Sequence, residues 1–192
     1  MEFWNLKNKF VCLYSGNLGR FYDIKTMLES AIQLKDNPNI LFLFVGDGHQ
    51  KKWAETFTKE NKLTNCLFQD YVPREDLGKL FMTADIGLVS LLPGHEGLSV
   101  PSKTFGLLAA GVPILGLLPE KSEIHKLINE EQCGVTIEPQ NSTLLTETIL
   151  KLSQDKEKLN ALKKNALTTI NNKYKLSKTS SKYYDLITSL DK

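Results

Sequence analysis

The chain has 192 residues, 41% of them hydrophobic, which is enough for one domain with a sizeable core. Its formal net charge of +2 is nearly balanced, which argues against a nucleic-acid partner recognised through bulk positive charge. No apolar run reaches membrane-spanning length, and the first residues lack the basic and apolar regions of a secretion signal. We therefore expect a cytoplasmic protein built as a single domain over residues 1–192.

The three cysteines, Cys12, Cys66 and Cys133, are odd in number and widely separated. Each lies in or beside an apolar run, so we expect three buried thiols in a reducing compartment rather than disulfides. No pair of Cys or His residues has the spacing of metal ligands, so the sequence predicts no metal site.

Short apolar runs alternate with amphipathic stretches along most of the chain. The runs 10–15 and 41–45 are continuously apolar and end at glycine, which is typical of strands buried on both faces of a parallel sheet. The expected strands lie at 10–15, 41–45, 66–68, 86–89, 113–117 and 134–137. The expected helices between and after them lie at 23–35, 50–62, 74–83, 122–129, 142–152, 156–171 and 177–190. Asp155 and Ser177 are the expected N-caps of the last two helices.

This alternation predicts an α/β protein with a doubly wound, six-stranded, parallel Rossmann-like sheet and extra C-terminal helices. In the common strand order 3-2-1-4-5-6, the first and fourth strands are neighbours at the point where the order reverses. Ligands bind there, beyond the carboxyl ends of the strands. The segments 16–20 and 95–113 follow these two strands and are expected to face each other across one crevice.

The segment 95–113 carries the chemistry most typical of phosphate binding. Pro101 suits the first turn of a helix, and that turn is expected to present free N–H groups of Ser102, Lys103 and Thr104. Lys103 adds a full positive charge. The carboxylate of Glu96 fits a ligand that also carries hydroxyl groups, as a sugar does. The structural alternative is a solvated Glu96, an ordinary Ser102 at a helix start and a surface Lys103.

The loop after the first strand contains Gly16 and Gly19, which permit close backbone approach, and Arg20, which can reach a diphosphate. A plain tight turn explains the two glycines equally well. The full G-x-G-x-x-G pattern and the acidic residue expected on a ribose are absent, which disfavours NAD.

Two further loops each allow two interpretations. Gly46-Asp47-Gly48 either lines the crevice or forms a turn in which Asp47 caps the next helix. Tyr71 and Val72 either border a nucleotide base or pack before the next helix. His95 and Glu96 are adjacent in an extended loop and point in different directions, so we do not pair them as acid and base.

Five motif regions follow one another along the chain. They are YSGNLG at 14–19, FVGDG at 44–48, YVPREDL at 71–77, TADIGL at 83–88, and EG, PSK and AAGVP within 96–113. In this order they resemble the carboxyl-terminal, donor-binding domain of family 4 glycosyltransferases. These are retaining enzymes of the GT-B architecture, and the likeness is greatest to bacterial members that build surface polysaccharides. The resemblance covers nearly the whole chain, and its specificity comes from the set rather than from any single motif.

The resemblance implies a crevice that binds a UDP-sugar as the donor substrate, with no cofactor and no metal, because amides and cations stabilise the departing diphosphate. It makes Glu96 the candidate catalytic carboxylate, directed at the sugar. The candidate donor-binding residues are Gly16, Asn17, Gly19, Arg20, Gly46, Gly48, Tyr71, Val72, Gly97, Leu98, Ser99, Ser102 and Lys103.

The sequence departs from the family pattern at two places. The second Glu of the family's Glu-x7-Glu pattern, which holds the ribose, is replaced by Thr104 or Gly106, depending on the alignment. The positions of the family's Arg and Lys in the first loop hold Asn17 and Tyr22, and Arg20 is the substitute candidate.

In GT-B enzymes the acceptor site belongs to an amino-terminal domain, whereas this chain begins almost at the first strand of the second one. We therefore expect an acceptor-binding domain or subunit as partner, docking on residues 1–7 and on the C-terminal helix within 176–192. The complete enzyme would use a lipid-linked or polysaccharide acceptor, with peripheral association at the inner face of the membrane. Alone, the chain should bind donor weakly and catalyse little. The alternatives are a non-catalytic nucleotide-sugar-binding module, a subunit of a split transferase, or half of a sugar-nucleotide epimerase.

Overall fold

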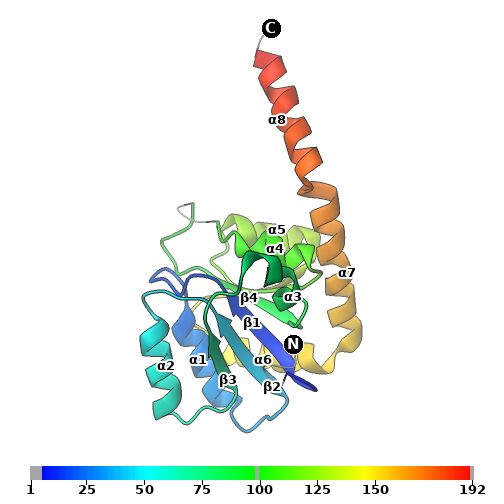
Figure 1. The fold of residues 1–192 in the computed structure, drawn as a ribbon. Coiled ribbons are helices and arrows are strands. Elements are labelled where there is room, and N and C mark those ends of the chain that lie inside the picture. Colours follow the sequence, from blue (N-terminus) through cyan, green and yellow to red (C-terminus); the bar gives the residue numbers. More distant parts are fainter. Residues whose placement is uncertain (1–5, 98–99, 191–192) are drawn as a thin grey trace.

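The structure of the chain is a computed structural model that describes residues 6–97 and 100–190. In these residues six parallel strands form one sheet in the order β3-β2-β1-β4-β5-β6 (Figure 1), which confirms the predicted strand order. The strands are β1 (Phe10–Ser15), β2 (Ile40–Val45), β3 (Cys66–Gln69), β4 (Ile86–Ser90), β5 (Ile114–Leu117) and β6 (Gly134–Ile137). The helices are α1 (Ile24–Gln33), α2 (Lys51–Glu60), the 3-10 helix η2 (Arg74–Asp76), α3 (Leu77–Phe81), α4 (Lys103–Ala109), α5 (Glu123–Glu131), α6 (Ser142–Gln154), α7 (Lys156–Lys173) and α8 (Leu176–Leu190).

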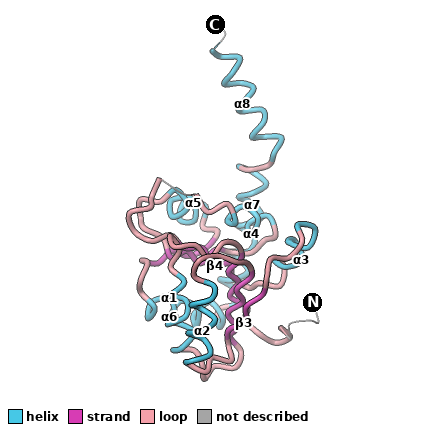
Figure 2. Tube along the Cα trace, turned by 60° about the vertical axis from the view of Figure 1, so that its left-hand side comes forward, coloured by secondary structure: helices cyan, strands magenta, loops and turns pink. Residues whose placement is uncertain are grey.

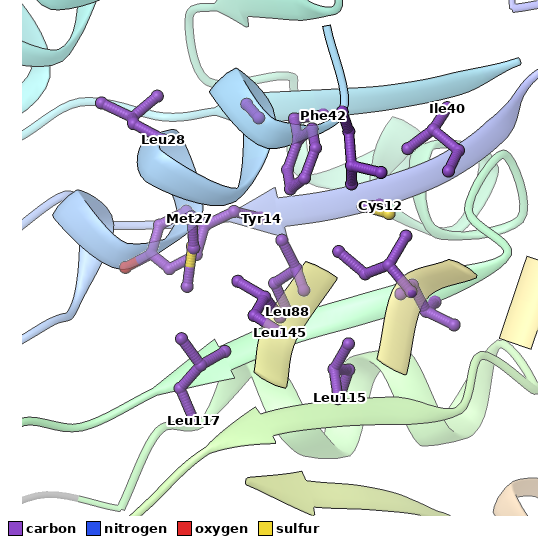
Figure 3. Close-up of a cluster of buried hydrophobic side chains, with 14 of the residues drawn as sticks. Cys12, Tyr14, Met27, Leu28, Ile40, Phe42, Leu88, Leu115, Leu117 and Leu145 are labelled. Carbon is purple, nitrogen blue, oxygen red and sulfur yellow. The ribbon is translucent and has the colours of Figure 1, made fainter. Parts of the chain in front are cut away.

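Side chains of the central strands alternate between two apolar cores, one on each face of the sheet. On one face Cys12 and Tyr14 of β1 meet α1 and α6, and Figure 3 shows Met27 and Leu145 packed there. On the other face Val11 and Leu13 belong to the core formed with α3, α4 and α5. Because every residue of β2 is buried, its continuous apolar run is explained by helices on both faces.

The three cysteines lie in these cores as free thiols, as predicted. Burial raises the pKa of the Cys12 thiol well above its usual value, that of Cys66 to about 12 and that of Cys133 to about 11. Thiols held in the protonated form are poor nucleophiles and poor metal ligands. Within the described residues, no group of three or more His, Cys, Asp or Glu side chains is arranged to hold a metal ion.

Most helix boundaries fall close to the prediction, with three corrections. The helix predicted at 74–83 is split into η2 and α3. Asp155 caps α7 by accepting a hydrogen bond from the Lys158 N–H, as expected. Ser177 is not an N-cap, because α8 already begins at Leu176. Asp47 does not cap α2, since its carboxylate accepts from the Gly48 N–H and Gln50 occupies the cap position.

The last helix, α8, extends away from the sheet in both views (Figures 1 and 2). It exposes four large side chains, which are Tyr183, Tyr184, Leu186 and Ile187. No helix within residues 6–97 and 100–190 has both the length and the apolar character needed to cross a bilayer. The predicted docking of this helix and of residues 1–7 on another domain stays a prediction, and residues 1–5 lie outside the described part.

Candidate functional site

The reversal of strand order lies between β1 and β4, which pair in parallel through Cys12 with Ile86 and Leu13 with Gly87. The loops after these strands therefore leave the same edge of the sheet, where open α/β sheets bind ligands. Close helix packing holds α4 above this edge. A side chain at Gly87 would come within 2.5 Å of Leu107, so the glycine allows α4 to approach β4.

The loops after β1 and β2 interlock at the bottom of the crevice. Gly46 has a positive φ of 141°, and a Cβ there would lie 2.1 Å from the Gly16 carbonyl oxygen. A Cβ on Gly48 would lie 2.4 Å from Oδ1 of Asn17. The Leu18 N–H donates to the Asp47 carbonyl at 2.8 Å. Packing between the two loops thus requires Gly46 and Gly48, whatever they do for a ligand.

Lys103 lies over the first glycine turn, and its amine lies over the rings of Tyr14 and Tyr22. The Nζ atom is 3.5 Å from the centre of the Tyr14 ring and 4.8 Å from that of Tyr22. A Cβ on Gly16 would be 3.4 Å from the Lys103 Cε. The residue as a whole is half-buried, but its Nζ is fully buried and has no hydrogen-bond partner among the described residues. Burial of this amine lowers the pKa of Lys103 to about 7.

The two tyrosines that enclose Lys103 are themselves fixed. The Tyr14 hydroxyl donates to the Asn17 carbonyl oxygen at 2.7 Å, and its ring meets that of Tyr22 edge-on, with centroids 6.3 Å apart. Burial, followed by the nearby phenols of Tyr22 and Tyr71, raises the pKa of Tyr14 well above its usual value. Tyr14 therefore acts here as a neutral aromatic wall.

The loop after β4 is tied to the loop after β1 by contacts between Phe21 and two residues. The Leu92 N–H donates to the Phe21 carbonyl at 2.9 Å, and the rings of Phe21 and His95 lie 4.4 Å apart. Glu96 instead accepts a hydrogen bond from the Gly94 N–H at 2.8 Å. His95 and Glu96 thus contact different neighbours, in agreement with the interpretation that they do not form an acid–base pair.

Asp23 connects the start of α1 to the end of β4 and to the loop before α6. No sequence motif identifies this residue. Its N–H donates to Oγ of Ser90 at the end of β4, at 3.1 Å. Its carboxylate caps α1 through the Thr26 N–H and accepts from the Gln140 N–H at 2.7 Å. The side chain is buried, so these bonds replace the water that a carboxylate otherwise needs.

The structure corrects one part of the free helix end predicted at α4. The helix begins at Lys103 rather than near Pro101, because residues 101–104 form a turn in which the Thr104 N–H donates to the Pro101 carbonyl at 3.1 Å. The Thr104 N–H is therefore not free to bind phosphate. Ser102 is exposed at the cap position and its side chain makes no capping bond.

Other predicted site residues are divided between the crevice and its surroundings. Gly19 accepts from the Gln50 side chain through its carbonyl, and Arg20 is exposed beside it. Tyr71 is 57% exposed and near enough to influence Tyr14. Val72 is half-buried and packs against the apolar core on the α3 and α4 face, and its place beside a base stays a prediction. Gly97 has a positive φ of 79°, and the predicted residues Leu98 and Ser99 lie outside the described part.

Cavities also occur at the opposite edge of the sheet, where the strands begin. One of about 790 Å³ is lined by Lys9, Asp85, Lys156 and Lys163, among others. Its charges are partly paired, since Lys163 lies 3.5 Å from the Asp85 carboxylate and the Lys9 amine donates to a carbonyl. In the described part of the chain, the buried side-chain atoms without a partner are Lys103 Nζ and Thr104 Oγ1, both in α4. The crevice is therefore the better candidate for a binding site.

Comparison with known proteins gives the family. Residues 2–169 match the family model described as "Glycosyl transferases group 1". A curated Pseudomonas aeruginosa protein named "Probable glycosyltransferase WbjE" is 32% identical over 143 residues, which are 74% of this chain and 36% of that protein. The chain thus spans little more than a third of that relative.

Two solved structures have the same fold at low sequence identity. The Anabaena protein HepE, in complex with UDP-glucose, superimposes with a TM-score of 0.83 at 16% identity, over 98% of this chain and 51% of HepE. The C-terminal domain of LpcC, a group 1 glycosyl transferase from Francisella tularensis, gives a TM-score of 0.73 at 16% identity, over 87% of both chains. By its family match and its Rossmann-like sheet of the GT-B type, the chain belongs to the group 1 glycosyl transferases.

Proposed function

We propose that the chain is the donor-binding unit, a single domain over residues 1–192, of a retaining glycosyltransferase of family 4. The proposal rests most directly on the Lys103 amine, which is buried, has no partner in the described residues and lies beside the Gly16 turn at the sheet's switch point. A buried polar group without a hydrogen-bond partner destabilises the fold, unless a ligand supplies the missing hydrogen bond. A diphosphate is such a ligand, and the UDP-glucose bound to HepE supports a UDP-sugar as donor.

In this proposal, the diphosphate lies against the Gly16 turn and is held by the cations of Lys103 and Arg20, with Ser102 adding a hydroxyl. Glu96 binds the sugar hydroxyls from the neighbouring loop, and Tyr71 borders the base. In the complete enzyme, the bond from the sugar's anomeric carbon to the diphosphate oxygen breaks, and a bond to an acceptor hydroxyl oxygen forms. UDP and the proton of that hydroxyl are released. Lys103 and Arg20 stabilise the negative charge that develops on the departing diphosphate. No metal or cofactor is proposed for this step.

The acceptor is proposed to be lipid-linked or a polysaccharide, on the resemblance to surface-polysaccharide enzymes. Since the chain spans a minor part of WbjE, we propose that acceptor binding requires an additional amino-terminal domain or subunit. The complete enzyme would act in the cytoplasm at the inner face of the membrane. The chain alone would bind donor weakly and show little transfer, because acceptor and donor must be held together for reaction.

A non-catalytic binding module remains the second candidate, and one observation favours it. The positions that align with the family's second Glu cannot supply a carboxylate to the crevice. Thr104 is buried, and a side chain at Gly106 would come within 2.7 Å of the Phe81 ring. Ribose recognition at the usual position is therefore absent. Transfer of sugar from UDP-sugar by the complete protein would support the enzyme over the module.

Calorimetric titration of the chain with UDP and with GDP tests donor binding. We expect saturable binding of UDP that weakens by about tenfold or more in Lys103→Ala, since a charge-assisted bond to phosphate contributes roughly 1.5–3 kcal/mol. Lys164→Ala, which removes an exposed lysine of α7, is the matched control and should bind like the unmodified chain. Equal affinity of both variants would contradict the assignment of Lys103, and no binding of either nucleotide would contradict the donor site.

A further inference from the structure

The Lys103 amine lies in surroundings that do not favour a positive charge. It is enclosed by the ring of Tyr14 from β1 and by the ring of Tyr22 from the segment before α1, with Gly16 beneath it. The phenols of Tyr14 and Tyr22 face it, and α4 itself carries no other ionisable side chain. The Tyr14 hydroxyl is already bonded to the Asn17 carbonyl, and no acceptor among the described residues meets the amine.

The balance between burial and the aromatic rings decides the charge of this amine. The faces of aromatic rings attract an ammonium ion, and this attraction offsets part of the free energy needed to remove the ion from water. Neither ring supplies a negative charge, and the Glu96 carboxylate accepts a hydrogen bond from the Gly94 N–H. The outcome is a pKa of about 7 for Lys103, with burial as its cause. Above neutral pH the enclosed side chain is therefore mostly an uncharged amine.

Binding of a diphosphate would shift the protonation equilibrium of the Lys103 amine toward the charged form. The diphosphate brings two or more negative charges to the Gly16 turn, next to the amine, and an opposite charge nearby favours the protonated form. Building on the proposed donor site, we propose that Lys103 lies as a neutral amine between Tyr14 and Tyr22 in the free chain and takes up one proton when the diphosphate binds. Balance requires only a proton from solvent: the lone pair on Nζ accepts it, and the resulting ammonium pairs with a phosphate oxygen.

This coupling has a direct consequence for affinity. If the bound complex holds one more proton than the free chain, UDP binding weakens about tenfold for each pH unit above the pKa of the free amine. A permanently charged side chain at the same position would show no such dependence. In the window from about pH 7.5 to 9, the phosphate groups of UDP are already deprotonated, and burial keeps Tyr14 and the cysteines protonated. An α-amino group ordinarily titrates at about pH 8, so variants of Lys103 are needed to assign the proton.

The test is calorimetric titration of the full chain with UDP at pH 8 in buffers of different ionisation enthalpy, which counts the protons taken up. We expect about one proton per UDP and an affinity that falls roughly tenfold per pH unit up to pH 9. Lys103→Arg keeps a cation that cannot be deprotonated in this range, so it should bind UDP with no proton uptake and a flat pH dependence. Lys103→Met should bind weakly and also without uptake.

The outcomes separate this inference from the donor site itself. UDP binding without proton uptake in the unmodified chain would overturn the neutral-amine proposal and leave the donor site intact. Proton uptake that persists in both Lys103→Arg and Lys103→Met would show that another group takes up the proton. That result would also overturn the neutral-amine proposal. If UDP does not bind the unmodified chain at all, the donor site and this inference fail together.

Discussion

Gly46→Ala is expected to lower the free energy of unfolding by about 3 kcal/mol or more. Two effects add at this position. The positive φ of 141° is strained for any residue with a Cβ. The Cβ would also lie 2.1 Å from the Gly16 carbonyl oxygen, so one loop would have to move. Neither loop can move freely, because the Gly46 N–H bonds the Gln69 carbonyl and the Gly16 N–H bonds the Val45 carbonyl.

Gly94→Ala is the matched control for this prediction. Gly94 also has a positive φ, of 86°, but a Cβ there would meet no atom within 4 Å. This variant should lose only the conformational term, about 1–2 kcal/mol. Urea unfolding of both variants measures the difference. Equal losses in Gly46→Ala and Gly94→Ala would contradict the account of interlocked loops.

Lys103→Met is expected to raise the free energy of unfolding by roughly 2–4 kcal/mol at pH 6, although it removes the proposed phosphate contact. The pKa of Lys103 is about 7 in the folded chain and 10.5 as a free side chain. The unfolded state therefore binds more protons between these values, and the stability of the unmodified chain rises as pH increases from about 7 to 10.5. Below pH 7 the full cost of burying the amine is present. Methionine fills similar space with no charge.

The pH dependence of this gain is its most specific feature. The advantage of Lys103→Met should be constant below about pH 7 and shrink steadily as the pH approaches 10. Urea unfolding at pH 6, 8 and 9.5 would record the trend. Lys164→Met, on the exposed side of α7, should change stability by less than about 0.5 kcal/mol at each pH. A loss of stability in Lys103→Met at pH 6, or a gain independent of pH, would mean that the amine is charged and well accommodated.

The strands and their order could be predicted because the information is local. Buried apolar runs such as Phe10–Ser15 end at glycine, and the rules for parallel sheets then leave few arrangements. The C-terminal ends of the helices and the start of α4 were predicted less accurately from the sequence. Pro101 is suited to a helix start, but its carbonyl bonds the Thr104 N–H in a separate turn, and α4 begins two residues later.

The meeting of the loops after β1 and β4 could likewise be predicted, but the contacts of individual side chains could not. Tyr14, Tyr22 and Lys103 come from segments about 80 residues apart, and only the fold shows that they enclose one amine. Asp23 bonds Ser90, which is 67 residues away, and Gln140, which is 117 residues away. Val72 packs against an apolar core, which is one of the two interpretations that its sequence position allowed. Such tertiary contacts leave no local pattern.

The central claim is that a nucleoside diphosphate binds at the crevice between the loops after β1 and β4. The most direct test is to add UDP to the ¹⁵N-labelled chain and follow its backbone amide signals by NMR. The account predicts that the largest shifts occur at Gly16, Gly48 and Lys103, with the signals of the opposite edge unchanged. Shifts confined to the cavity lined by Lys9, Lys156 and Lys163, or no shifts at all, would contradict it.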